Sequence, residues 1–276
     1  MSSLRELLTR AVAAEASDIH ITSGHPPVYR VHQQLVESGF EAIEADTVAA
    51  LCHEIMPAHL TDRFRTHHEA DFSFAEEGVG RFRVNAFQSI SCCTLAMRYV
   101  RAQIPSFEDL HLPPQIKALS MSPRGIILAA GTTGCGKSTT LAAIVQHINA
   151  TLKRRIITIE DPIEYVFENA RSVVSQREVG LDTVSFHAGL KHVLRQDPDV
   201  IMIGEMRDAE SFMAALAAAE TGHLVLTTLH TGTAAQAVPR ILDFFPSTER
   251  DQLRMALADN LRAVFCQRHA ELVAFG

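Results

Sequence analysis

The chain has 276 residues, of which 47% are hydrophobic and 21% are charged, a composition typical of a globular protein with one large domain or two modest ones. The net charge of −7 argues against wholesale binding of nucleic acid. Five cysteines without a Cys-x-x-Cys pair argue against a disulfide framework or a zinc–thiolate site. Since no apolar run approaches the roughly 18–20 residues of a transmembrane segment, we expect a soluble protein of a reducing compartment.

The first hundred residues predict short helices and strands in alternation. Apolar residues recur at helical spacing over residues 4–14 and 45–55. Polar and apolar residues alternate over residues 18–22 and 80–88, which predicts two strands.

A change of pattern follows at residues 101–123, which contain four prolines. They predict a linker at 101–114 and a short helix near 115–119. Strands then alternate with helices, which predicts an α/β domain with a mainly parallel sheet. We expect strands at 125–130, 155–160, 200–205 and 224–230, helices from 137 and at 186–195 and 210–220, and a closing helix of about twenty residues from near Ser247.

The clearest motif is a glycine-rich segment between a buried strand and an amphipathic helix, which matches the P-loop pattern. Its glycines let backbone N–H groups turn inward around phosphate, and the helix dipole favours the same anion. Lys137 is expected to reach the β- and γ-phosphates of ATP, and Ser138 to ligate Mg²⁺. We interpret Cys135 as a small tolerated side chain rather than a nucleophile. The candidate nucleotide-binding residues are Gly131, Thr132, Thr133, Gly134, Cys135, Gly136, Lys137, Ser138 and Thr139.

Acidic residues follow the predicted strands. Asp199 begins one strand and Glu205 ends it, about 20 Å away at 3.3 Å per residue. Ligands of parallel α/β sheets bind beyond the carboxyl ends of the strands. Glu205 is therefore the first candidate to polarise the attacking water or to hold Mg²⁺ through a water, and Glu160 is the second. Asp199 is expected to be a turn or cap residue.

Histidines and arginines supply further candidates. His223 and His230 lie about 23 Å apart along one strand, so a single metal ion cannot bind both. His230 is placed at the active edge, where it contacts the γ-phosphate or serves only as a hydrogen-bonded structural residue. Candidate arginines for phosphate are Arg81 and Arg83 on one strand face, and Arg195 and Arg207, which flank the strand that ends in Glu205.

Four ordered motifs begin at Gly131, Thr158, Asp197 and Ala219: Gly-Thr-Thr-Gly-Cys-Gly-Lys-Ser, Thr-Ile-Glu-Asp-Pro-Ile-Glu, Asp-Pro-Asp-Val-Ile-Met-Ile-Gly-Glu-Met-Arg-Asp and Ala-Glu-Thr-Gly-His-Leu-Val-Leu-Thr-Thr-Leu-His-Thr. They resemble the Walker A, Asp box, Walker B and His box of the secretion ATPase superfamily. Within it, the chain is similar to the PilT-like retraction ATPases of type IV pili. Ala-Ser-Asp-Ile-His-Ile from Ala16 and Gln-Arg-Glu-Val-Gly from Gln176 support that branch.

The resemblance implies a PAS-like domain at 1–100 and a RecA-like ATPase domain at 115–276, with ATP between the two domains. It implies a homo-hexameric ring that acts with an inner-membrane pilus platform protein and related retraction ATPase subunits. Such a protein is cytoplasmic and peripheral to the inner membrane through partners. By motif match, Lys137 and Ser138 bind phosphate and Mg²⁺, and the catalytic candidates are Glu205, Glu160, His230, Arg195 and Arg207, with Arg81 and Arg83 as further phosphate-sensing arginines.

Two departures from the family pattern bear on these expectations. The first Walker positions have Gly-Thr-Thr-Gly-Cys where relatives usually have Gly-Pro-Thr-Gly-Ser, a change that we expect to be tolerated. The chain also ends soon after Gln267-Arg, before the C-terminal segment of the family, so we expect nucleotide binding to survive and motor output to be affected.

Three alternatives stay open. An assembly or secretion ATPase of the same superfamily usually carries a tetracysteine zinc insertion and a larger N-terminal extension, and neither is present in this sequence. A small-molecule P-loop kinase predicts a monomer with a lid specific for the acceptor, whereas an acid at Glu205 favours water as acceptor. A truncated modulator would bind ATP without turnover and act on a full-length partner.

Overall fold

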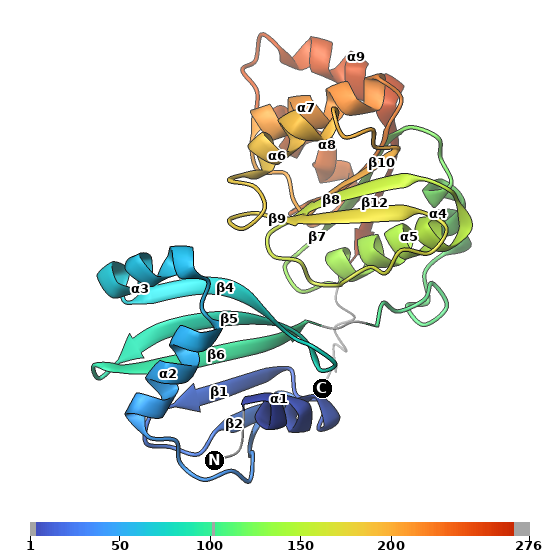
Figure 1. Ribbon diagram of the computed structural model, residues 1–276. Coiled ribbons are helices and arrows are strands. Elements are labelled where there is room, and N and C mark those ends of the chain that lie inside the picture. Colours follow the sequence, from blue (N-terminus) through green and yellow to red (C-terminus); the bar gives the residue numbers. More distant parts are fainter. Residues whose placement is uncertain (1–3, 101–102, 268–276) are drawn as a thin grey trace, which may run out of the picture. The chain divides into compact units, whose positions relative to one another are not determined.

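The computed structural model describes residues 4–100 and 103–267 (Figure 1). The chain divides into two compact units, residues 1–102 and 103–276. Residues 101–102 of the predicted linker lie outside the described residues, whereas Phe107 already packs into a core cluster of the second unit. Among the described helices, none has the length and apolar character that crossing a bilayer requires.

The N-terminal unit is built on a six-stranded antiparallel sheet in the order β3-β2-β1-β6-β5-β4. Its strands are β1 (Asp18–Thr22), β2 (Val28–Val31), β3 (Gln34–Glu37), β4 (Glu69–Glu76), β5 (Gly80–Ser89) and β6 (Cys92–Val100). The helical elements are α1 (Leu4–Ala13), α2 (Ala45–Ile55), the 3₁₀ turn η1 (Ala58–Leu60) and α3 (Thr61–His67).

The alternation of β5 decides which face of this sheet is covered. Phe82, Val84 and Ala86 are buried in a core cluster that includes side chains of α1 and α2. Arg81 and Arg83 alternate with them and are half-buried on the other face. The predicted separation of the two faces is confirmed.

The second unit holds a six-stranded parallel sheet in the order β12-β7-β11-β10-β8-β9. This confirms the predicted α/β class. The strands are β7 (Gly125–Gly131), β8 (Arg155–Glu160), β9 (Val173–Glu178), β10 (Val200–Ile203), β11 (Leu224–Leu229) and β12 (Leu261–Gln267). The helical elements are α4 (Pro114–Ser120), α5 (Lys137–Thr151), α6 (Phe186–Val193), α7 (Ala209–Glu220), η2 (Ala234–Gln236), α8 (Ala237–Leu242) and α9 (Arg250–Asn260).

Helices cover both faces of this sheet, which explains its continuous apolar strands. Ile126 and Leu128 of β7 belong to the cluster formed with α6, α7, α8 and α9. Ile127 and Ala129 point to the opposite face and pack with α4 and α5. Figure 1 shows α4 and α5 on one side of the strands and α6 to α9 gathered on the other.

The predicted closing helix of about twenty residues is wrong. Helix α9 ends at Asn260, and the chain continues as β12 along the edge of β7. Leu253, Leu257 and Leu261 continue the i, i+4 spacing of a helix, but β7 offers an open edge whose backbone groups need partners. In the strand, Leu261 and Phe265 contribute to the two opposite core clusters.

Candidate active site

The predicted phosphate loop connects β7 to α5 and depends on glycine at two positions. Gly131 has a φ of 152°, and a Cβ there would collide with the Cys135 thiol and lie 2.6 Å from the Gln267 carbonyl oxygen. Gly136, directly before α5, has a φ of 92°, in the left-handed region that side chains disfavour. These glycines let the backbone turn sharply into the helix.

Lys137 begins α5 and is buried. Its ammonium donates hydrogen bonds to the carbonyl oxygens of Gly131 at 2.9 Å and Thr132 at 2.8 Å. A buried ammonium needs such partners because burial penalises an unpaired charge. The loop carbonyls therefore hold the cation at the start of the helix, where the helix dipole also favours an anion.

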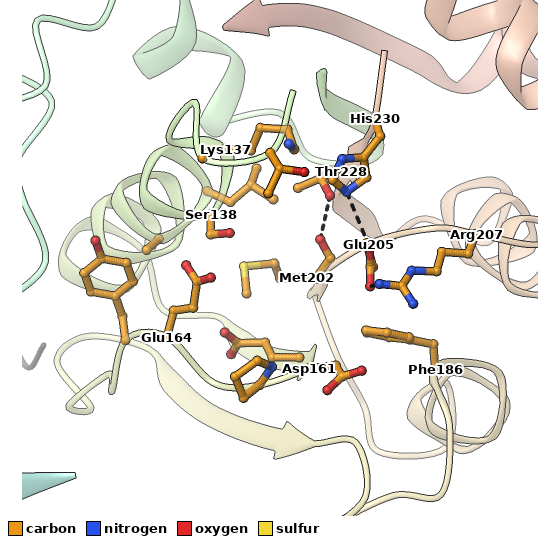
Figure 2. A pocket seen from close by; sticks show the side chains of 18 residues that line it. Lys137, Ser138, Asp161, Glu164, Phe186, Met202, Glu205, Arg207, Thr228 and His230 are labelled. Carbon is orange, nitrogen blue, oxygen red and sulfur yellow. Dashed lines mark hydrogen bonds and ion pairs between the residues drawn. The ribbon is translucent and has the colours of Figure 1, made fainter. Parts of the chain in front are cut away.

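A cavity of about 340 Å³ opens beside this loop (Figure 2). It brings together Lys137, Glu160 and Glu205, and so confirms that the strand-end acids lie at the same edge as the loop. The lining residues are Thr133, Gly134, Lys137, Ser138, Leu141, Ala142, Glu160, Asp161, Pro162, Glu164, Tyr165, Phe186, Met202, Gly204, Glu205, Arg207, Thr228 and His230.

Glu205 lies in the loop just beyond β10, and its side chain is 13% exposed. One carboxylate oxygen contacts the Arg207 guanidinium, and the other lies 3.5 Å from Nε2 of His230. Figure 2 shows the Glu205 and His230 side chains turned toward one another across the ends of β10 and β11. The neighbouring Thr228 hydroxyl donates to the Gly204 carbonyl at 2.7 Å, which joins the two strand ends.

Glu160 ends β8 and is only 7% exposed. Burial raises the pKa of this carboxyl to about 7, although hydrogen bonds from Thr158 and Gln176 lower it. The Thr158 hydroxyl donates at 2.6 Å and the Gln176 amide at 3.1 Å, both to the same carboxylate oxygen. A carboxyl that titrates near neutral pH inside a cavity is a candidate for proton transfer.

The irregular segment after β8 supplies another wall of the cavity. Asp161, Glu164 and Tyr165 all line it. The Tyr165 hydroxyl lies 3.1 Å from the Thr139 hydroxyl on α5. Thr139, which was predicted to bind nucleotide, contacts this tyrosine but does not itself line the cavity.

The opposite ends of the same strands have no part in this cavity. Asp199 accepts hydrogen bonds from the Arg154 side chain at 2.8 Å and the Arg155 amide at 2.7 Å. His223 is 2.8 Å from the Ala218 carbonyl at the end of α7. The predicted position of Asp199, at the end of β10 remote from Glu205, is confirmed, and its side chain bonds to residues at the start of β8.

The remaining candidates lie outside the cavity lining. Arg195 is exposed in the turn after α6. Cys135 is half-buried beside Gly131. Arg81 and Arg83 belong to β5 of the N-terminal unit. Their roles stay predictions. Gly131, Thr132 and Gly136 shape the loop without lining the cavity.

Several residues of the site carried no signal that sequence reasoning used. Phe186 and Met202 line the cavity with apolar atoms. Thr228 lies within β11, which is buried along its whole length, and its contact with Gly204 depends on the pairing of β10 and β11. The motif that begins at Gln176 was a signal for the family branch but not for the contact with Glu160.

Comparison with known proteins extends this picture. Residues 1–274 match the family described as Type II/IV secretion system protein. The type IV pilus retractation ATPase PilT of Pseudomonas aeruginosa is 42% identical over 264 residues, which are 96% of this chain and 77% of that protein. A twitching motility protein of Neisseria gonorrhoeae is 42% identical over 257 residues, 91% of this chain and 69% of that protein. The crystal structure of the pilus retraction motor PilT with bound ADP has a TM-score of 0.92 and 43% identity, covering 97% of this chain and 78% of that one.

Proposed function

The chain belongs to the type II/IV secretion system protein family, and we propose that it is an ATP-hydrolysing motor subunit that drives retraction of a type IV pilus in twitching motility. One observation carries the chemistry: Lys137 of the phosphate loop lines the same cavity as Glu160 and Glu205. The likeness to PilT and to the twitching motility protein supports the pilus as the load.

Phosphate binding follows from the loop. Backbone N–H groups at the start of α5 and the Lys137 ammonium supply the positive end of the site. The phosphate oxygens compete with the Gly131 and Thr132 carbonyls for that ammonium. Since phosphoryl transfer needs positioning and charge stabilisation more than covalent chemistry, a prearranged loop supplies much of what the reaction requires.

Glu205 is the residue that we assign to the attacking water. Its carboxylate contacts Arg207, faces His230 and lines the cavity. It accepts a hydrogen bond from the water and takes up the proton as the water attacks the γ-phosphate. His230 lies on the same side and is assigned to contact the γ-phosphate.

The residues also fit Mg²⁺. Four carboxylates line the cavity, from Glu160, Asp161, Glu164 and Glu205, against the two cations of Lys137 and Arg207. Among the described residues, no group of three His, Cys, Asp or Glu side chains forms a ready metal site. This suits a cation that is held mainly by phosphate and water oxygens, with the Ser138 hydroxyl and, through a water, Glu205. When bound, it neutralises charge on the phosphoryl oxygens.

The assembly is proposed on the family resemblance. We assign the chain to a homo-hexameric ring at the inner face of the inner membrane, where it acts with a pilus platform protein and related retraction ATPase subunits. Arg81, Arg83, Arg195 and Arg207 are the candidates to sense phosphate in that ring. Arg207 is 71% exposed, so its guanidinium is accessible to a ligand or partner.

The proposed function is tested in a bacterium that lacks its own retraction ATPase. Since motor output is expected to be reduced, expression of this chain should restore part of the twitching, and Glu205→Ala, produced to the same level, should restore none. Purified Glu205→Ala should still bind ATP, because the phosphate loop is intact. Twitching restored by Glu205→Ala, or ATP turnover undiminished by it, would refute the assignment.

A ring has its own test. Specific ATPase activity should fall on dilution if neighbouring subunits complete the site. Activity per subunit that stays constant down to concentrations where only monomer exists would contradict a site shared between subunits.

A further inference from the structure

The segment between β8 and β9 lines the cavity although it has no regular secondary structure. Asp161, Pro162, Glu164 and Tyr165 all contribute to the wall. We call residues 161–167 the acidic loop. Without a backbone ladder of its own, such a loop keeps its shape only through side-chain contacts, so the question is which residues hold it.

Gln176, in the middle of β9, forms hydrogen bonds with the backbone of the acidic loop. Its amide nitrogen donates to the Tyr165 carbonyl at 2.7 Å and to the Glu160 carboxylate at 3.1 Å. Its amide oxygen accepts from the Phe167 backbone N–H at 2.8 Å. Both amide hydrogens and the carbonyl oxygen are therefore used.

The strand register explains how one residue reaches both targets. Gln176 pairs with Thr158 of β8, and the Thr158 hydroxyl donates to the same oxygen of Glu160. Two donors from neighbouring strands thus fix a single carboxylate oxygen. Glu178, two residues farther along β9, accepts from the Ile163 backbone N–H at 3.3 Å and anchors the first half of the acidic loop.

We propose that Gln176 is a positioning residue for ATP hydrolysis, which orients the Glu160 carboxylate and the acidic loop together at the edge of the nucleotide cavity. The inference rests on the proposed ATPase function. Gln176 does not itself line the cavity, so it acts through Glu160 and the loop backbone rather than on the substrate.

Two replacements of Gln176 test whether it orients Glu160 and the acidic loop. Gln176→Met keeps the length of the side chain but removes all three hydrogen bonds. Gln176→Glu keeps an acceptor for the Phe167 N–H but replaces the donor nitrogen with an oxygen, which repels the Tyr165 carbonyl and the Glu160 carboxylate. Ser175→Ala is the matched control, because Ser175 is the adjacent half-buried residue of β9 and alternate residues of a strand point to opposite faces.

Kinetics test the action on Glu160. Both Gln176 variants should lower kcat for ATP by about tenfold, with KM within about twofold of the wild type, since a misaligned group weakens the reaction more than ground-state binding. Ser175→Ala should change neither constant by more than about twofold. Wild-type kcat in both Gln176 variants would overturn the proposal.

Hydrogen exchange tests the action on the loop without any turnover. In the unliganded protein, Gln176→Met should raise exchange at Phe167 by about five- to tenfold, which is the loss of one hydrogen bond. Ser175→Ala should leave that amide protected. Unchanged exchange in Gln176→Met would show that the loop does not depend on this residue, whereas an inactive wild type with the expected exchange pattern would refute the ATPase function alone.

Discussion

The two edges of the parallel sheet carry the same kinds of residue and use them differently. Strand β10 is preceded by Asp199 and followed by Glu205, and β11 is preceded by His223 and followed by His230. At the edge where the strands begin, the amino edge, Asp199 and His223 form hydrogen bonds with neighbouring residues of the fold. At the carboxyl edge, Glu205 and His230 meet in a cavity with Lys137. Residue type alone does not make a site, since the edge of the sheet decides which polar groups converge.

The titration of the acids follows the same division. Burial of Asp199 raises the pKa of its carboxyl, but the Arg155 amide and the Arg154 guanidinium together outweigh burial and hold the pKa below its usual range. Burial dominates at Glu160 and raises the pKa to about 7. At the amino edge, the neighbouring donors therefore stabilise the ionised form of Asp199. At the carboxyl edge, Glu160 can gain or lose a proton near neutral pH.

Amide replacements of the acids at the two ends of β10 should show the largest difference between the two edges of the sheet. Glu205→Gln should lower kcat by about a thousandfold, because the carboxylate that accepts the proton of water is lost. Asp199→Asn should leave kcat within about twofold, since its partners belong to the fold. Steady-state ATP hydrolysis measures both, and equal losses from the two variants would contradict the division between the edges.

Two lysines at opposite ends of α5 provide the next contrast. Lys137→Ala should weaken ATP binding by about a hundredfold, because a charge-assisted contact with phosphate is lost. Lys153, exposed just beyond α5, is the control, and Lys153→Ala should bind ATP normally. Titration with a fluorescent ATP analogue measures both affinities. Similar affinities for the two variants would remove Lys137 from the site.

Glu160→Gln tests the raised pKa of this buried acid through the pH dependence of the free energy of unfolding. Because the folded-state pKa of Glu160 is about 7 and its ordinary value is 4.5, the wild type loses stability as the pH rises from 4.5 to 7, when the unfolded chain ionises first. The variant should escape this loss and gain about 3 kcal/mol over the wild type at pH 8, and little at pH 4. Urea unfolding at both pH values measures the difference, and a gain that does not grow with pH would contradict the assignment.

Asp199→Asn should show the smallest effect, with the opposite sign. The lowered pKa of Asp199 contributes stability that is present above the ordinary value of 3.8 and is lost as the pH falls through the folded-state pKa. The side chain is 38% exposed, so solvent screens the pair with Arg154, and the variant should lose only about 1 kcal/mol at pH 7. Thermal unfolding at pH 7 and pH 3 should show the difference shrinking in acid, and a larger loss in acid would be inconsistent with the assigned contacts.

The sequence predicted those features that depend on local pattern or on a general rule of sheet topology. Lys137 and the glycines of the loop form a contiguous motif. Glu160 and Glu205 could be placed beside them because the ends of parallel strands share one edge. The amino-edge position of Asp199 followed from the length of one strand.

Other features depend on contacts between distant segments. Leu253, Leu257 and Leu261 keep helical spacing, and only the open edge of β7 turns the last part into β12. Gln176 reaches Glu160 because β9 pairs with β8 in one particular register. A pattern of residues along the chain does not contain such a register.

The central claim is that ATP binds at the carboxyl edge, with its phosphates in the loop before α5. A crystal structure of the protein with a non-hydrolysable ATP analogue tests it most directly. We expect the phosphates against the backbone amides of residues 134–138, with the Lys137 ammonium turned from the Gly131 and Thr132 carbonyls toward them. An analogue bound elsewhere, with Lys137 still held by those two carbonyls, would contradict the account.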